Sequence, residues 1–309
     1  MDVMIGSDDF EKRPFNFWPE PYLYQLLNTV VGKPCVVLVG ESHPINLEHH
    51  TALAVRFLNI QRIIRRKVKL VVCQDFWGSA CVVAPDIRPD QVQCNDEYAE
   101  ELALVTYQHL TEKDIVIRGN PGVKKVTVSH EVREQYEALR ENYGTVYFYA
   151  GAGEPETSAE LRLLQKCLEH TTGGWCLVAG FHPKLVEEHG QTWRAFLTGF
   201  GERVIEAKPG TGDEWGTIAP VIVSGASTIM TTAVYAGNIA ISLHTPEIIK
   251  IFAKRQMSKV PQVAMGWAHS VSEPCDLAQF GRPAEEALKK LQPFDVQKAY
   301  EGVVSVLEM

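Results

Sequence analysis

Short runs rich in Val and Ile alternate with longer stretches of helical period along this chain, and this alternation restricts its fold most strongly. The runs are apolar at successive positions, which is typical of strands buried on both faces of a parallel sheet. They lie at 35–39, 68–73, 91–94, 115–117, 146–149, 176–178, 204–206, 221–223 and 239–242. Helices are expected at about 47–66, 96–110, 130–142, 157–171, 184–198, 227–236, 246–257 and 283–308. The pattern predicts a doubly wound α/β architecture.

Length indicates more than one domain. The chain has 309 residues, which exceeds the length at which one hydrophobic core usually stops growing. Near the middle, a strand ends in the turn residues 119–121, a charged helical segment follows, and a new strand begins after Gly144. We therefore predict an N-terminal domain at 1–140 and a second domain at 141–285.

The amino-acid composition limits which functions the protein can have and in which cellular compartment it is expected. Apolar residues make up 45% and charged residues 22%, as in ordinary soluble enzymes, and the net charge of −8 disfavours nucleic acid as a partner without excluding a local basic patch. The seven cysteines form no C-x-x-C pair, and the first thirty residues resemble no signal peptide. No H-E-x-x-H or Cys/His zinc spacing is present either. We expect a cytoplasmic protein without a metal, a cofactor or a transmembrane segment.

The most informative segment is 221–241, VIVSGASTIMTTAVYAGNIAI. It predicts a strand, a turn of small residues and the start of a helix, with Ser224, Gly225, Ser227 and Thr228 just past the strand. Ligands of open α/β sheets bind at this edge, and small residues let a phosphate approach the backbone. Ser227 or Thr228 could cap the helix and also offer a hydroxyl. A capped turn without any ligand is the equally open alternative.

Two further turns follow apolar strands in the same half of the chain. One carries Gly151, Gly153 and Glu154 (YFYAGAGE), and the other carries His182 and Lys184 (CLVAGFHPKL). A G-x-G turn alone is a weak signal, and a single His is often a satisfied surface residue. Together with the serine-containing turn, however, they could converge on one pyrophosphate.

The order GAGE, GFHPKL and VIVSGASTIMTTAVYAG resembles the C-terminal donor domain of GT-B glycosyltransferases over roughly 140–285. The layout is similar to the transferases of peptidoglycan and lipid A synthesis, to UDP-N-acetylglucosamine 2-epimerases and to bacterial transferases that use cytidine-linked donors. The resemblance implies two Rossmann-like domains, of which the N-terminal one is reduced, and a helix at 286–309 that packs back on the first domain. It also implies a nucleotide-sugar co-substrate linked to UDP or CDP.

Two features depart from that family pattern. Many such transferases carry a Glu in the helix after the serine-rich turn, where it holds the donor ribose, but this chain has Thr231 and Thr232 there. Only about 33 residues precede the first clear strand, so we expect a reduced acceptor side.

A transferase needs a base that removes the proton of the acceptor hydroxyl. In the fold that the chain resembles, this group usually comes from the N-terminal domain. The candidates are Glu41 and His43 in VLVGESHP and Asp75 in VVCQDFWG, each just past a predicted strand. Loop polarity without chemistry, or an Asp that caps the next turn, is the alternative for each.

The sequence therefore predicts a metal-independent GT-B glycosyltransferase that moves a sugar from a nucleotide-sugar donor to a hydroxyl acceptor of unknown identity. An epimerase or hydrolase of nucleotide sugars with the same fold is the first alternative. A non-catalytic protein that binds nucleotide sugars is the second.

Overall fold

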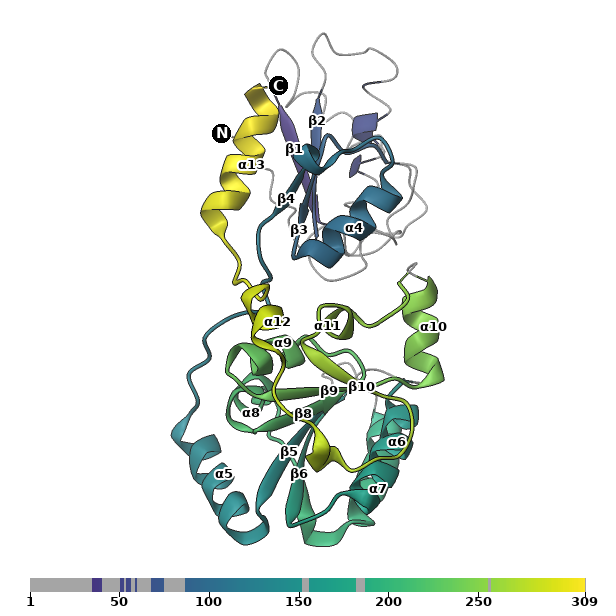
Figure 1. Cartoon of the computed structure of the whole chain (residues 1–309), viewed down its shortest axis with the longest axis vertical. Helices are drawn as coiled ribbons and strands as arrows, with labels where there is room; N and C mark the ends of the chain where they lie inside the picture. Colours follow the sequence, from purple (N-terminus) through teal and green to yellow (C-terminus); the bar gives the residue numbers. More distant parts are fainter. Residues whose placement is uncertain are drawn as a thin grey trace.

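The computed structural model of the chain describes residues 35–40, 51–52, 54–56, 59, 68–74, 87–151, 156–181, 187–254 and 257–308. Its strands form two separate sheets, one of four strands and one of six, which lie at the top and at the bottom of Figure 1. Every strand pair in both sheets is parallel, which confirms the doubly wound α/β architecture expected from the apolar runs. Among the described residues, no helix combines the length and apolar character needed to cross a bilayer.

The first sheet has its strands in chain order, β1-β2-β3-β4. They are β1 (Val36–Gly40), β2 (Lys69–Cys73), β3 (Gln91–Cys94) and β4 (Ile115–Ile117). Helix α4 (Glu97–Thr106) follows β3, and the short 3-10 helix η2 (Glu112–Asp114) precedes β4. Helix α4 begins after Asp96, whose carboxylate accepts a hydrogen bond from the Ala99 N–H at 2.9 Å and so satisfies a free donor of the first turn.

The second sheet has the order β10-β9-β8-β5-β6-β7. Its strands are β5 (Thr145–Ala150), β6 (Trp175–Gly180), β7 (Val204–Glu206), β8 (Val221–Ser224), β9 (Ile239–Leu243) and β10 (Ala268–Val271). The chain moves outward from β5 through β6 and β7, and then returns to β8 on the other side of β5. Neighbouring strands β5 and β8 are therefore the topological switch point of this sheet.

Helices cover both faces of the second sheet (Figure 1). They are α5 (His130–Tyr143), α6 (Glu156–His170), α7 (Glu187–Thr198), α8 (Gly212–Ile218), α9 (Ile229–Tyr235), α10 (Pro246–Lys254) and α11 (Pro261–Ala264), with the 3-10 helices η3 (Gly201–Arg203) and η4 (Leu277–Gln279). On β5, Val146 and Phe148 belong to one buried core and Tyr147 and Tyr149 to the other. Burial on both faces explains why β5 shows no polar alternation.

The expected helix at 283–308 is instead two helices, α12 (Glu285–Lys289) and α13 (Val296–Glu308). The prediction of a continuous helix was wrong because Pro293 lies between them and cannot donate a backbone hydrogen bond. This break runs beside the segment that follows β4. The Asn120 N–H donates to the carbonyl of Gln292 at 2.9 Å, and the Asp295 N–H donates to the carbonyl of Arg118 at 2.7 Å.

Helix α13 packs against all four strands of the first sheet. Two buried amides of β3 hold its backbone: Gln91 Nε2 donates to the carbonyl of Gly302 at 3.0 Å, and Gln93 Nε2 donates to the carbonyl of Ala299 at 2.8 Å. A Cβ on Gly302 would lie 3.0 Å from Gln91 Oε1 and 3.0 Å from a methyl group of Val116. The helix can therefore approach the sheet this closely because residue 302 has no side chain.

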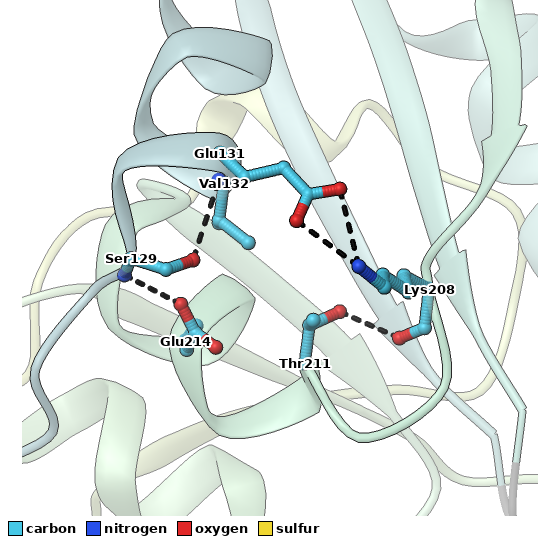
Figure 2. Close-up of polar contacts among 6 residues, drawn as sticks. All are labelled: Ser129, Glu131, Val132, Lys208, Thr211 and Glu214. Atoms are coloured by element: carbon cyan, nitrogen blue, oxygen red, sulfur yellow. Dashed lines mark hydrogen bonds and ion pairs between the residues drawn. The ribbon is translucent and has the colours of Figure 1, made fainter.

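Helix α5 packs against β5 and β6 of the second sheet and against α8, one of the helices that cover this sheet. The predicted boundary at residues 140/141 falls within this helix, and the division of the chain into domains stays a prediction. Figure 2 shows how the N-terminus of α5 is attached. Glu214 accepts a hydrogen bond from the Ser129 N–H at 2.6 Å, and Lys208 forms an ion pair with Glu131 at 3.1 Å. The connection between the sheets is therefore anchored to the second domain.

Candidate functional site

The candidate site lies at the carboxyl ends of β5 and β8, which are paired at the centre of the second sheet. Tyr147 is in register with Val221, and Tyr149 with Val223. Parallel pairing places the segments that leave the two strands side by side, and ligands of open α/β sheets bind at such a switch point. The predicted site residues Gly151 and Ser224 are therefore brought to the same edge of the sheet.

Ser224 links the two strand ends. Its hydroxyl donates to the carbonyl of Ala150 at 2.6 Å and accepts from the Ser227 N–H at 3.2 Å. The side chain is fully buried. Because its proton and one lone pair are both in use, Ser224 positions the turn, and its predicted contact with the donor stays a prediction.

Gly225 occupies a position where no side chain fits. A Cβ there would lie 2.1 Å from Glu160 Oε1 and 2.6 Å from Ile248 Cδ1. Glu160 on α6 is fully buried and accepts a hydrogen bond from the Tyr149 hydroxyl at 2.8 Å. The carbonyl of Gly225 accepts from the Ser242 hydroxyl at 2.7 Å. Glycine thus lets the turn lie directly on α6 and α10.

Ser227 and Thr228 form the open part of the turn. The Ser227 hydroxyl accepts from the Ile229 N–H at 3.3 Å, so Ser227 rather than Thr228 supplies the predicted side-chain cap of α9. Thr228 is exposed and Ala226 is half-buried. Their N–H groups donate no hydrogen bond to any residue within the described ranges. The turn thus presents two free backbone donors and one exposed hydroxyl.

Gln262, next to the same turn, was not anticipated from the sequence. It is buried, and its Nε2 donates to the carbonyl of Ser227 at 3.2 Å. Its Oε1 makes no hydrogen bond to a described residue. A lone Gln in a short helix carries no sequence signal, since only the packing of α11 places it here.

Gly151 continues the chain from β5. Its N–H donates to the carbonyl of Gly180 at 2.9 Å, and a Cβ would lie 2.7 Å from Trp193 Cη2. Ala150 and Gly180 are paired, so the segments after β5 and β6 leave the same edge of the sheet. The close approach of the Trp193 ring explains the glycine.

The other predicted donor contacts lie outside the described residues, namely Gly153, Glu154, His182 and Lys184. The proposed catalytic residues Glu41, His43 and Asp75 lie outside them as well. Their roles stay predictions. Within the described ranges, no group of three His, Cys, Asp or Glu side chains is arranged to hold a metal ion.

The serine-containing turn also lies against the segment that connects the two sheets. The Thr232 hydroxyl on α9 donates to the carbonyl of Gly122 at 2.7 Å, and a Cβ on Gly122 would lie 3.8 Å from Thr228. Gly122 belongs to the loop that follows β4. Thr232 therefore joins α9 to the segment between the two sheets.

His244 follows β9, the strand next to β8. Its Nδ1 lies 2.8 Å from the Ser270 hydroxyl. Burial, and to a smaller extent Lys259, lowers the pKa of His244 below its ordinary value, so the ring is neutral at pH 7. His269 contacts the carbonyl of Gly281 at 2.7 Å. Both histidines make local contacts.

The sequence matches no protein-family model and no curated protein. Solved structures, however, match nearly the whole chain. HepE (Alr3699) of Anabaena in complex with UDP matches over 93% of this chain and 82% of its own length, at 10% identity and a TM-score of 0.58. The chain has the GT-B fold.

Two other matches represent different activities on that fold. The UDP-GlcNAc 2-epimerase of Neisseria meningitidis bound to UDP-GlcNAc covers 94% of this chain and 80% of its own, at 12% identity and a TM-score of 0.55. A glycosyltransferase of Rickettsia africae matches over 99% of this chain and 84% of its own length, at 12% identity and a TM-score of 0.53. At these identities the likeness concerns the fold alone. It confirms the GT-B architecture expected from the sequence motifs.

Proposed function

We propose that the protein binds a nucleotide sugar at the β5–β8 switch point and transfers the sugar to a hydroxyl acceptor. The observation that carries this proposal is the turn at 224–228. It lies at the switch point of a GT-B fold, presents the free N–H groups of Ala226 and Thr228, and contacts Gly122 in the segment that connects the two sheets. Backbone donors of this kind suit the oxygens of a diphosphate.

In this proposal the diphosphate lies against the turn, where the Thr228 hydroxyl adds a third donor. Gly151, Gly153 and Glu154 after β5 are proposed to line the donor site, together with His182 and Lys184 after β6. As the glycosidic bond to the diphosphate breaks, negative charge grows on the leaving phosphate oxygen. Donors that face this oxygen lower the barrier because they stabilise charge that is absent in the ground state.

The first domain is proposed to supply the acceptor site and the base. Glu41, His43 and Asp75 each follow a predicted strand of the first sheet and remain the candidates for the base. A carboxylate or neutral imidazole within hydrogen-bond reach of the acceptor hydroxyl would take its proton as the bond to the sugar forms.

A second candidate is the epimerisation or hydrolysis of a nucleotide sugar. It is supported by the fact that the solved structures with this fold include UDP-N-acetylglucosamine 2-epimerases. Both candidates require the same donor site, so binding tests the site and product analysis separates the activities. A protein that only binds nucleotide sugars would bind the donor but form no product.

Thermal unfolding in the presence of UDP-, CDP-, GDP- and ADP-linked sugars tests the proposal. A ligand at 100 times its Kd stabilises the native state by about 2.7 kcal/mol, which corresponds to a rise in Tm of roughly 5 °C or more in domains of this size. We expect such a rise for one nucleotide class. If no member of the panel raises the Tm, the donor site at this turn is wrong.

The variant Thr228→Val locates the site, because it removes the exposed hydroxyl and keeps the shape of the side chain. We expect a loss of UDP affinity of about tenfold, typical of one hydrogen bond to a charged group. Thr217→Val is the matched control, since the Thr217 hydroxyl donates to the Asp213 carbonyl within α8 at 2.9 Å. Release of nucleotide only when an acceptor is present would support transfer. An altered sugar without any acceptor would support epimerisation.

A further inference from the structure

Three polar side chains lie at the carboxyl edge of the first sheet, away from the turn at 224–228. Gln74 follows β2, Asn95 follows β3 and Arg118 follows β4. Because β2, β3 and β4 are adjacent and parallel, these residues lie side by side. Gln74 is completely buried and Asn95 is 3% exposed, whereas Arg118 is partly exposed.

Hydrogen bonds join the three residues into one cluster. Gln74 Oε1 accepts from the Asn95 N–H at 3.0 Å, and Arg118 Nη2 donates to the carbonyl of Gln74. The guanidinium of Arg118 lies 5.0 Å from the centre of the Phe294 ring, which holds it in place. The contact at Oε1 also fixes the orientation of the Gln74 amide, so Nε2 must be a donor.

Three polar atoms of the cluster have no hydrogen-bond partner in the part of the chain that the structure describes. They are Gln74 Nε2, Arg118 Nε and Asn95 Oδ1. Arg118 also forms no ion pair with a described carboxylate, although a guanidinium always carries its charge. Buried polar groups in native proteins are almost always satisfied, and exceptions often mark a ligand site.

A fourth unsatisfied atom lies further along the same loop. Asn120 is 3% exposed, and its Oδ1 accepts from the Gly122 N–H at 2.7 Å, so its Nδ2 is a donor. That Nδ2 has no partner among the described residues. Gly122 is the residue that contacts Thr232 of the second domain. Unused donors therefore continue from Arg118 toward the proposed donor site.

We infer that the two free donors of this cluster, Gln74 Nε2 and Arg118 Nε, bind an anionic oxygen group, a carboxylate or a phosphate, carried by the acceptor. The inference rests on the proposed function only in assigning the group to the acceptor. A neutral sugar hydroxyl would leave the charge of Arg118 unbalanced. An oxyanion accepts from both Arg118 Nε and Gln74 Nε2, and hydrogen bonds of an ionised pair are the stronger ones. The acceptor is thus an acidic sugar or a phosphorylated compound.

Binding to the full chain saturated with UDP tests this inference by titration calorimetry. The probes are inorganic phosphate, glucose 6-phosphate, glucuronate and uncharged glucose. We expect at least one anionic probe to bind and glucose not to bind. Tighter binding of glucuronate or of glucose 6-phosphate distinguishes a carboxylate from a phosphate. Equal binding of glucose and the anions, or no binding of any anion, would overturn the inference.

Two variants connect the binding to the cluster. Gln74→Glu keeps the acceptor for the Asn95 N–H but places a carboxylate beside Arg118, and Arg118→Gln removes the charge. Each is expected to weaken binding of the anionic probe about tenfold or more. Lys124→Gln is the matched control, since it removes an exposed positive charge nearby that pairs with Asp213. Equal losses in the control and in both cluster variants would refute the assignment.

The outcomes also separate this inference from the proposed function. If Arg118→Gln unfolds, Gln74→Glu still carries the test, with thermal unfolding as the measure of folding. Failure of every nucleotide sugar to bind, with anion binding that depends on Gln74, would reject the donor site and keep the cluster as an anion site. Normal UDP binding without any effect of Gln74→Glu on the anionic probes would reject the cluster alone.

Discussion

The variant Gly225→Ala adds one methyl group at the centre of the proposed donor site. An ideal Cβ at this position lies 2.1 Å from Glu160 Oε1 and 2.6 Å from Ile248 Cδ1. Normal contacts between such atoms are about 3.5 Å, so one partner must move by about 1 Å. Glu160 and Ile248 are both buried in helices that pack on the sheet, and so the turn itself is the part most easily displaced.

The expected cost follows from two opposing effects. Overpacking a dense interior costs about 1–3 kcal/mol, whereas replacing Gly by Ala in the unfolded chain contributes about 0.4–1 kcal/mol of stability. The free energy of unfolding should therefore fall by about 1–2 kcal/mol. The displaced turn should also lose alignment of the Ala226 and Thr228 N–H groups, which weakens UDP binding about tenfold if one such hydrogen bond is lost.

Urea unfolding followed by tryptophan fluorescence measures the first effect, because Trp193, Trp215 and Trp267 are fully buried around the second sheet. Calorimetric titration with UDP measures the second. Gly281→Ala is the matched control, since a Cβ on Gly281 meets no atom within 4 Å. If Gly225→Ala unfolds at the same urea concentration as Gly281→Ala, the packing argument is refuted. If it binds UDP normally, the turn is not the donor site.

Two further predictions concern the connection between the domains. Thr232→Val removes the hydrogen bond to the Gly122 carbonyl and should lower the free energy of unfolding by about 1–2 kcal/mol. The control Thr217→Val should change the free energy of unfolding little. Equal effects of the two variants would contradict the role of Thr232 in joining α9 to the connecting segment. The Ser129 hydrogen bonds lower the pKa of Glu214, so the ionised carboxylate stabilises the fold above its ordinary pKa of 4.5, and this stability is lost as the pH falls further. Glu214→Gln should therefore lower the urea midpoint at pH 7, and the difference from the unmodified protein should shrink as the pH falls below 4.5; a pH-independent difference between the two proteins would argue against it.

Local pattern determined the secondary structure of most of the described chain. The nine predicted runs correspond to β1–β9, because strands buried on both faces are mostly apolar at successive positions; β3, with the buried side chains of Gln91 and Gln93, is an exception. The strand β10 (AHSV) was missed since it lies at the edge of the sheet and carries His269 and Ser270. Helix α8 was missed because seven residues with two glycines show no clear helical period.

The candidate site was partly visible in the sequence for a similar reason. Small residues after a strand, as in Ser224–Thr228, indicate a turn that a phosphate can approach, and this signal is local. The residues around this turn in the sequence do not show that the Ser224 hydroxyl donates to the carbonyl of Ala150. They also do not show that Gly225 packs against the Glu160 side chain. These contacts join residues 74 and 65 positions apart in the chain, so only the packed sheet and helices bring them together.

The periodicity of apolar residues alone thus determined that the chain forms parallel α/β layers with small-residue turns. The buried face of a strand or helix can be recognised from the apolar residues that are close together in the sequence. Tertiary structure decided the strand order, and with it the β5–β8 switch point. It also decided that Gln74, Asn95 and Arg118 meet at one edge of the first sheet. No sequence spacing predicts this meeting, because three separate strands carry these residues and only hydrogen bonding between those strands sets their distance.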